Sequence, residues 1–143
     1  MHGPGKKAGE LFNSGLLCAE SVLLAVAEHK GITNELIPKI ATGFCGGISR
    51  TSGMCGALSG AVMAVNMIHG RNTPDNLPVE SYTRTARLVQ MFKQRFGSTL
   101  CTDICGCDLS TEAGREAFQA NDVKNKKCVP MTEQAADMAV GVI

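Results

Sequence analysis

Apolar residues recur at intervals of three and four along nearly the whole chain, and no segment alternates convincingly between polar and apolar residues. This spacing gathers apolar side chains on one face of an α-helix, whereas alternation would indicate a half-buried strand. The sequence therefore predicts an all-α fold, a compact bundle of about six to eight helices with several short ones. No internal repeat or long linker interrupts the chain, so residues 1–143 are predicted to form one domain.

Glycines and small polar residues mark the expected ends of these helices. Gly31, Gly70 and Gly97 are predicted to end helices, and Ser52 to cap the one that follows it. On the clearest amphipathic helix, Tyr82, Ala86, Val89 and either Phe92 or Lys93 share one side. The predicted helices cover residues 5–12, 16–30, 53–69 and 79–96, with shorter ones after Thr33 or Asn34, after Ser98, at 110–120 and at 131–140.

The charge and hydropathy of the chain exclude some classes of function. Hydrophobic residues make up 44% and charged residues 19%, which is typical of a globular chain. A net charge of +1 lacks the excess of positive charge that binding to a nucleic-acid backbone requires. The apolar stretch around Cys18 is interrupted by Glu20 and lacks a small-residue cleavage site, so we interpret it as a helix and not a signal peptide. We therefore expect a cytoplasmic protein that is not inserted in a membrane.

Seven cysteines are the most informative residues for function. The count is too low for a secreted disulfide scaffold, and an odd count leaves at least one thiol outside any intramolecular pair. In a reducing compartment, clustered cysteines are more often catalytic or metal-binding than structural. The alternative, in which they pack as small apolar side chains, remains open.

Three cysteines fall close to the predicted start of a helix, namely Cys18, Cys55 and Cys101. Free backbone amides and the helix dipole favour an anion at this end, so the sequence predicts a lowered pKa for these thiols. After Cys55, the residues Gly56 and Gly60 are spaced so that another helix can approach closely.

The late cluster CTDICGC holds Cys101, Cys105 and Cys107. Its spacing matches neither the paired CxxC of zinc ribbons and thioredoxin-like sites nor the cysteine run of bacterial ferredoxins. A metal ion or iron–sulfur cluster held by cysteines from distant segments therefore stays an alternative.

Four segments together resemble one protein family: LCAESVLLA from Leu17, FCGGISRTSGMCGALSGAVMA from Phe44, FGSTLC from Phe96 and KKCV from Lys127. The chain resembles the C_GCAxxG_C_C family of redox-active cysteine proteins over nearly its whole length. The resemblance implies redox activity without a defined substrate. It assigns the family cysteines to Cys18, Cys55, Cys101 and Cys128.

Three hypotheses for function follow. In the first, the protein exchanges thiols and disulfides with an unknown redox partner, Cys55 attacks, and Cys18 or Cys101 resolves the mixed disulfide. In the second, cysteines ligate a metal ion or an iron–sulfur cluster, and the candidate ligands are Cys18, Cys55, Cys101 and Cys128, with Cys45, Cys105 and Cys107 as possible additions. In the third, the chain is a structural or partner-binding helical domain in which the cysteines serve only as packing. Under any of the three, the small-residue face and the Met-rich segment are consistent with a homodimer.

Overall fold

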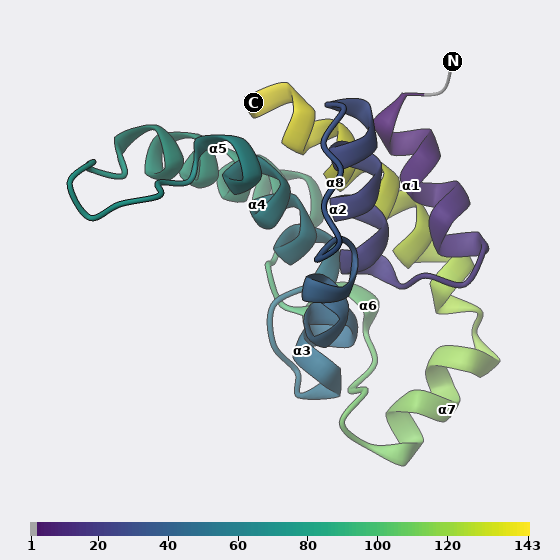
Figure 1. Ribbon diagram of the computed structural model, residues 1–143. Helices are drawn as coiled ribbons and strands as arrows, with labels where there is room; N and C mark the ends of the chain where they lie inside the picture. Colours follow the sequence, from purple (N-terminus) through teal and green to yellow (C-terminus); the bar gives the residue numbers. More distant parts are fainter. Residues whose placement is uncertain (1–2) are drawn as a thin grey trace.

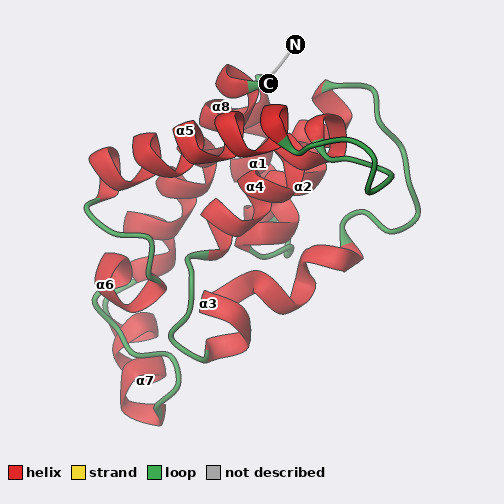
Figure 2. Cartoon of the chain, turned by 90° about the vertical axis from the view of Figure 1, so that its left-hand side faces the viewer, coloured by secondary structure: helices red, strands yellow, loops and turns green. Residues whose placement is uncertain are grey.

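The computed structural model describes residues 3–143, so residues 1–2 of the predicted domain lie outside the described part. Within it the chain forms eight α-helices and no strand, which confirms the all-α class (Figures 1 and 2). The helices are α1 (Pro4–Asn13), α2 (Cys18–His29), α3 (Cys45–Arg50), α4 (Gly56–His69), α5 (Val79–Phe96), α6 (Cys101–Cys105), α7 (Glu112–Ala120) and α8 (Val129–Val142), with a 3₁₀ helix η1 (Lys39–Phe44) and a π-helix η2 (Lys124–Cys128) between them.

The core is built from α1, α2, α4 and α8, which pack against one another. Small residues let these helices approach closely. A Cβ atom on Gly60 would lie only 2.6 Å from the carbonyl oxygen of Ala19 on α2. This contact confirms that the glycines of α4 face a neighbouring backbone, as the sequence predicted. Between the backbones, fully buried side chains such as Leu23, Leu58 and Val65 fill the core.

Helix α5 and the loop before it extend away from the core as an arm (Figure 1). Its bounds match the predicted helix, and Gly97 ends it with a φ of 82°. The predicted face is wrong in the first half of the helix, where Tyr82 is 71% exposed and Ala86 is exposed, and right at Phe92, which is fully buried together with Leu88. In the first half of α5, Thr85 instead contacts the core helix α4 by accepting a 3.0 Å hydrogen bond from the Asn66 amide.

Several helix starts differ from the prediction. Helix α4 begins at Gly56, and Ser52 does not cap it, because its hydroxyl donates a 2.9 Å hydrogen bond to Asp108. The third predicted helix is a 3₁₀ helix that starts after Pro38, since the Asn34 side chain instead accepts from the Leu36 amide in a turn. Helix α8 begins at Val129, slightly earlier than predicted.

Helix α3 is a left-handed turn. Gly46 and Gly47 have φ of 67° and 70°, and the following Ile48, Ser49 and Arg50 have φ of 57°, 55° and 66°. Glycine adopts this conformation at little cost, whereas other L-residues lose about 1–2 kcal/mol each. Side-chain hydrogen bonds support the turn, such as the 2.8 Å bond that the Ser49 hydroxyl donates to the Gly43 carbonyl.

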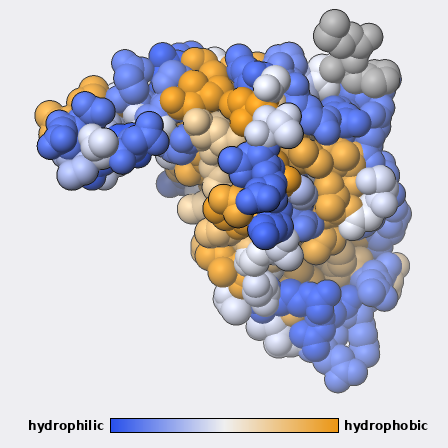
Figure 3. Space-filling model, viewed as in Figure 1, coloured by the Kyte–Doolittle hydropathy of each residue, from blue (hydrophilic) through white to orange (hydrophobic). Residues whose placement is uncertain are grey.

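Helix α7 lies apart from the core in both ribbon views (Figures 1 and 2). None of its residues is buried, and hydrophilic residues dominate the lower part of the molecule where it lies (Figure 3). Its Ala117 and Phe118 pack on a separate small cluster made of Cys105, Cys107 and Val123. No helix in residues 3–143 is both long and apolar enough to cross a bilayer.

Candidate functional site

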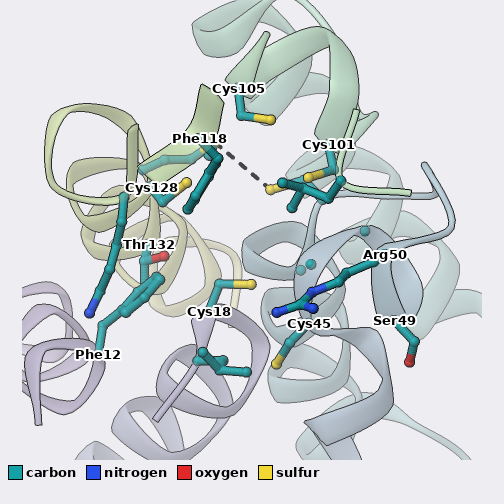
Figure 4. Close-up of a pocket in the computed structure, with 18 of the residues that line it drawn as sticks. Phe12, Cys18, Cys45, Ser49, Arg50, Cys101, Cys105, Phe118, Cys128 and Thr132 are labelled. Atoms are coloured by element: carbon teal, nitrogen blue, oxygen red, sulfur yellow. Dashed lines mark hydrogen bonds between the residues drawn. The ribbon is translucent and has the colours of Figure 1, made fainter. Parts of the chain in front are cut away.

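A cavity of about 450 Å³ lies between the core and the segment that carries α6, α7 and η2 (Figure 4). Its walls are mainly apolar, with contributions from Phe12, Leu109 and Phe118. Six of the seven cysteines line it, although they come from distant parts of the sequence. They are Cys18, Cys45, Cys55, Cys101, Cys105 and Cys128. The four cysteines predicted from the sequence therefore meet at one cavity, and Cys45 and Cys105 join them.

Cys18 and Cys45 form the first thiol pair of the cavity. Cys18 is the first residue of α2, whose start is tied to η1 because Glu20 accepts hydrogen bonds from the Leu17 amide at 2.9 Å and from the Thr42 hydroxyl at 2.7 Å. Cys45 follows η1 directly. The neighbouring Cys18 thiol, together with burial, raises the pKa of Cys45, whose own thiol donates a 3.7 Å hydrogen bond to the carbonyl of Ala41. Cys45 therefore keeps its proton beside Cys18.

Gly56 leaves the space that this pair occupies. A Cβ atom on Gly56 would overlap the Cys18 sulfur and would lie 3.2 Å from the Cα of Cys45. Only glycine fits this position without moving one of the two cysteines. The glycine after Cys55 is thus explained by the packing of Cys18 and Cys45 against the start of α4.

The second group contains Cys55, Cys101, Cys105 and Cys128. Cys55 is the N-cap residue of α4, and its sulfur lies 3.8 Å from the sulfur of Met131. Cys101 and Cys105 are the first and last residues of α6. The Cys105 thiol also donates a 3.2 Å hydrogen bond to the carbonyl of Cys107, whose side chain does not line the cavity.

The lowered pKa predicted for Cys55 and Cys101 is wrong. The amides of Ala57 and Leu58 at the start of α4 do lower the pKa of Cys55, but loss of hydration outweighs them and raises it. Burial also raises the pKa of Cys101, with the nearby Cys105 and Cys55 adding to the effect. For Cys128, burial is again the main cause and raises the pKa to about 12, although Lys127 opposes it. Position at the start of a helix alone does not set the pKa of these thiols, because their surroundings are apolar.

The cysteines also differ in access. Cys18, Cys101 and Cys128 are partly exposed, whereas Cys45, Cys55 and Cys105 are buried, with Cys55 only 4% exposed. A reagent that enters the cavity therefore meets the first three sulfurs before the others.

A preformed metal centre is not supported by the donor groups. Within residues 3–143, no three His, Cys, Asp or Glu side chains come together in a group that could hold a metal ion.

Three further residues of the cavity were not predicted from the sequence. Arg50 extends its guanidinium from α3 past Cys45 (Figure 4). Lys124 lies with its ammonium 5.0 Å from the centre of the Phe12 ring. Thr132 is fully buried, and its hydroxyl has no hydrogen-bond partner in the described chain. Only Arg50 carried a signal, because it follows the Gly46–Gly47 pair between two cysteines.

Comparison with known proteins agrees with the earlier resemblance. The model of a family described as "Putative redox-active protein (C_GCAxxG_C_C)" matches residues 16–142. An uncharacterized protein of Archaeoglobus fulgidus is 31% identical over 108 residues, which cover 69% of this chain and 72% of the relative. No solved structure matches the chain. The matched region contains all seven cysteines of the sequence and every cysteine of the cavity. The chain belongs to the C_GCAxxG_C_C family.

Proposed function

We propose that the protein exchanges thiols and disulfides at its cavity, with Cys18 as the attacking thiol and Cys45 as the resolving thiol. The observation that carries this proposal is the pairing of a partly exposed cysteine with a buried one that keeps its proton. Such a pair can oxidise within one molecule, because the Cys18 sulfur and the Cys45 backbone pack against the same residue, Gly56.

The reaction balances with a disulfide, RSSR, as the oxidant. The Cys18 thiolate attacks one sulfur, forms a mixed disulfide and releases one RS⁻. Cys45 then gives up its proton and attacks the Cys18 sulfur, which releases the second RS⁻. Two cysteine thiols are oxidised to one disulfide, two RSH are formed after protonation, and an external dithiol reverses the reaction.

The proposal moves the attacking role from Cys55, where the sequence had suggested it, to Cys18. Cys55 is buried against Met131, and burial raises its pKa, so both its access and its thiolate fraction are reduced. The other family cysteines, Cys101 and Cys128, remain candidates for passing the disulfide on within the same cavity.

The order of reaction can be measured with a neutral disulfide. The reduced protein is mixed anaerobically with bis(2-hydroxyethyl) disulfide, quenched with acid and mapped by differential alkylation. We expect a Cys18–Cys45 disulfide to form first. In the Cys45→Ser variant, we expect the mixed disulfide to accumulate on Cys18.

The matched control is Cys107→Ser, because this thiol does not line the cavity. It should react as the unmodified protein does. If Cys18→Ser retains the rate of the first step, or if Cys55 is oxidised before Cys18, the assignment of the attacking thiol is wrong.

A further inference from the structure

The charges around the cavity have one sign. Among residues 3–143, Arg50 and Lys124 are the two charged residues that line it, and no Asp or Glu of that range does so. Within residues 3–143 the Arg50 guanidinium has no hydrogen bond or ion pair to the protein. From this arrangement we infer that the cavity binds a small organic disulfide that carries a carboxylate, with the carboxylate on Arg50 and the disulfide beside Cys18. The inference deepens the proposed function and rests on it.

Carboxylates do occur on the outer side of these cations. Glu112, Glu116 and Asp122 line an adjoining hollow that also touches Arg50 and Lys124. None of them is within ion-pair distance of either cation in the described chain. The two cations therefore remain available to an anion that approaches from the cysteine side.

Thr132 is a second, independent indication of a ligand. Its side chain lines the cavity and is fully buried, yet its hydroxyl has no partner in residues 3–143 (Figure 4). Buried hydroxyl groups in folded proteins are nearly always hydrogen-bonded, because a buried hydroxyl without a partner lowers the stability of the protein. A polar group on a bound ligand would satisfy it.

The left-handed turn gives a third indication. Arg50 has a φ of 66°, in a conformation that costs energy for any residue except glycine. Strained backbone of this kind concentrates at binding and active sites. Here the turn directs the guanidinium over Cys45 into the cavity (Figure 4).

The size and walls of the cavity define the class of ligand. A volume of about 450 Å³ is within the range of small-molecule sites. The apolar walls formed by Phe12 and Phe118 suit the methylene groups of a short-chain disulfide. An arginine guanidinium binds a carboxylate through two parallel hydrogen bonds, which would hold one end while the sulfur reaches Cys18.

The experiment uses three disulfides that share a CH2CH2–S–S–CH2CH2 unit and differ in charge. They are 3,3′-dithiodipropionate with two negative charges, neutral bis(2-hydroxyethyl) disulfide and cystamine with two positive charges. We measure the rate at which each disulfide oxidises the reduced full chain. We then divide it by the rate at which the same disulfide reacts with dithiothreitol, which removes the intrinsic reactivity of the disulfide. We expect the normalised rate for the dianion to exceed that for the neutral disulfide about tenfold, and cystamine to be slowest.

Arg50→Gln should abolish the preference for the dianion, so that its normalised rate falls to the value for the neutral disulfide. The matched control is Arg87→Gln, on the exposed side of α5 and outside the cavity, which should keep the preference. Added salt should reduce the preference, because Arg50 is exposed at one end.

Binding of octanedioate, a dicarboxylate of similar length without sulfur, separates the two proposals. We expect calorimetry to show that octanedioate binds and that Arg50→Gln weakens its affinity about tenfold. Thr132→Val should also weaken the affinity, and it should raise the stability of the ligand-free protein. Exchange through Cys18 with no charge preference and no octanedioate binding would overturn this inference and leave the proposed function standing. Octanedioate binding without any exchange would overturn the proposed function and support the anion site alone.

Discussion

Replacing Gly60 by alanine tests the close crossing of α2 and α4 that the core depends on. The change favours the helix itself by about 1 kcal/mol, because glycine is a poor helix former. The new Cβ, however, would lie 2.6 Å from the Ala19 oxygen and 3.0 Å from the Ala19 Cα, about 0.8 Å inside ordinary contact with the oxygen. Backbone atoms cannot rotate away, so α2 and α4 must separate. Overpacking of this kind lowers the free energy of unfolding by about 1–3 kcal/mol. Because the neighbour here is backbone, we expect a cost at or above the upper end of this range.

We therefore expect Gly60→Ala to lower the free energy of unfolding by about 2 kcal/mol, or Tm by about 8 °C. Urea unfolding of the reduced protein, followed by circular dichroism, measures this change. Gly141→Ala is the matched control, because a Cβ on Gly141 of α8 would have nothing within 4 Å. It should raise the free energy of unfolding by about 0.5–1 kcal/mol. Equal stabilisation by both substitutions would refute the close crossing.

Three further predictions follow from the buried thiols, a buried hydroxyl and Gly56. The pKa of Cys128 is raised from 9.0 to about 12, so the folded state holds this proton more tightly than the unfolded chain does. Its contribution to stability should be complete below about pH 9 and lost as the pH rises towards 12. In urea unfolding at several pH values, the free energy of unfolding of Cys128→Ser should therefore fall less steeply with pH than that of the unmodified protein. Ser21→Ala should raise the free energy of unfolding by about 1 kcal/mol, because the Ser21 hydroxyl is fully buried without a partner in the described chain; a fall on urea unfolding would contradict this. Gly56→Ala should slow the alkylation of Cys18, measured by mass spectrometry, because its Cβ would overlap that sulfur, while Gly141→Ala should leave the rate unchanged.

Local sequence signals predicted much of the fold. Gly31 and Gly97 end their helices with positive φ, as expected, because the left-handed residue after a helix is a property of a few neighbouring residues. Ser52 failed as a predicted cap because its hydroxyl binds Asp108, 56 positions away in the chain. The exposure of Tyr82 was missed for a similar reason, since Thr85, and not Tyr82, contacts Asn66 of another helix.

The candidate site was predictable in its cysteines and less so in its chemistry. The positions of Cys18, Cys55 and Cys101 beside helix starts were predicted correctly. The sign of the pKa shift at Cys55 was not, because sequence shows where a residue stands on a helix but not how much water reaches it. Thr132 belongs to no motif, and its missing hydrogen-bond partner is visible only in three dimensions.

The left-handed turn at Ile48, Ser49 and Arg50 has a consequence for selection and engineering. Glycine at any of these positions would relieve backbone strain, so a search for higher thermal stability would favour it there. At Arg50 the same substitution would remove the guanidinium that faces the cysteine cavity. Selection for heat resistance and selection for ligand recognition would therefore act in opposite directions on this one residue.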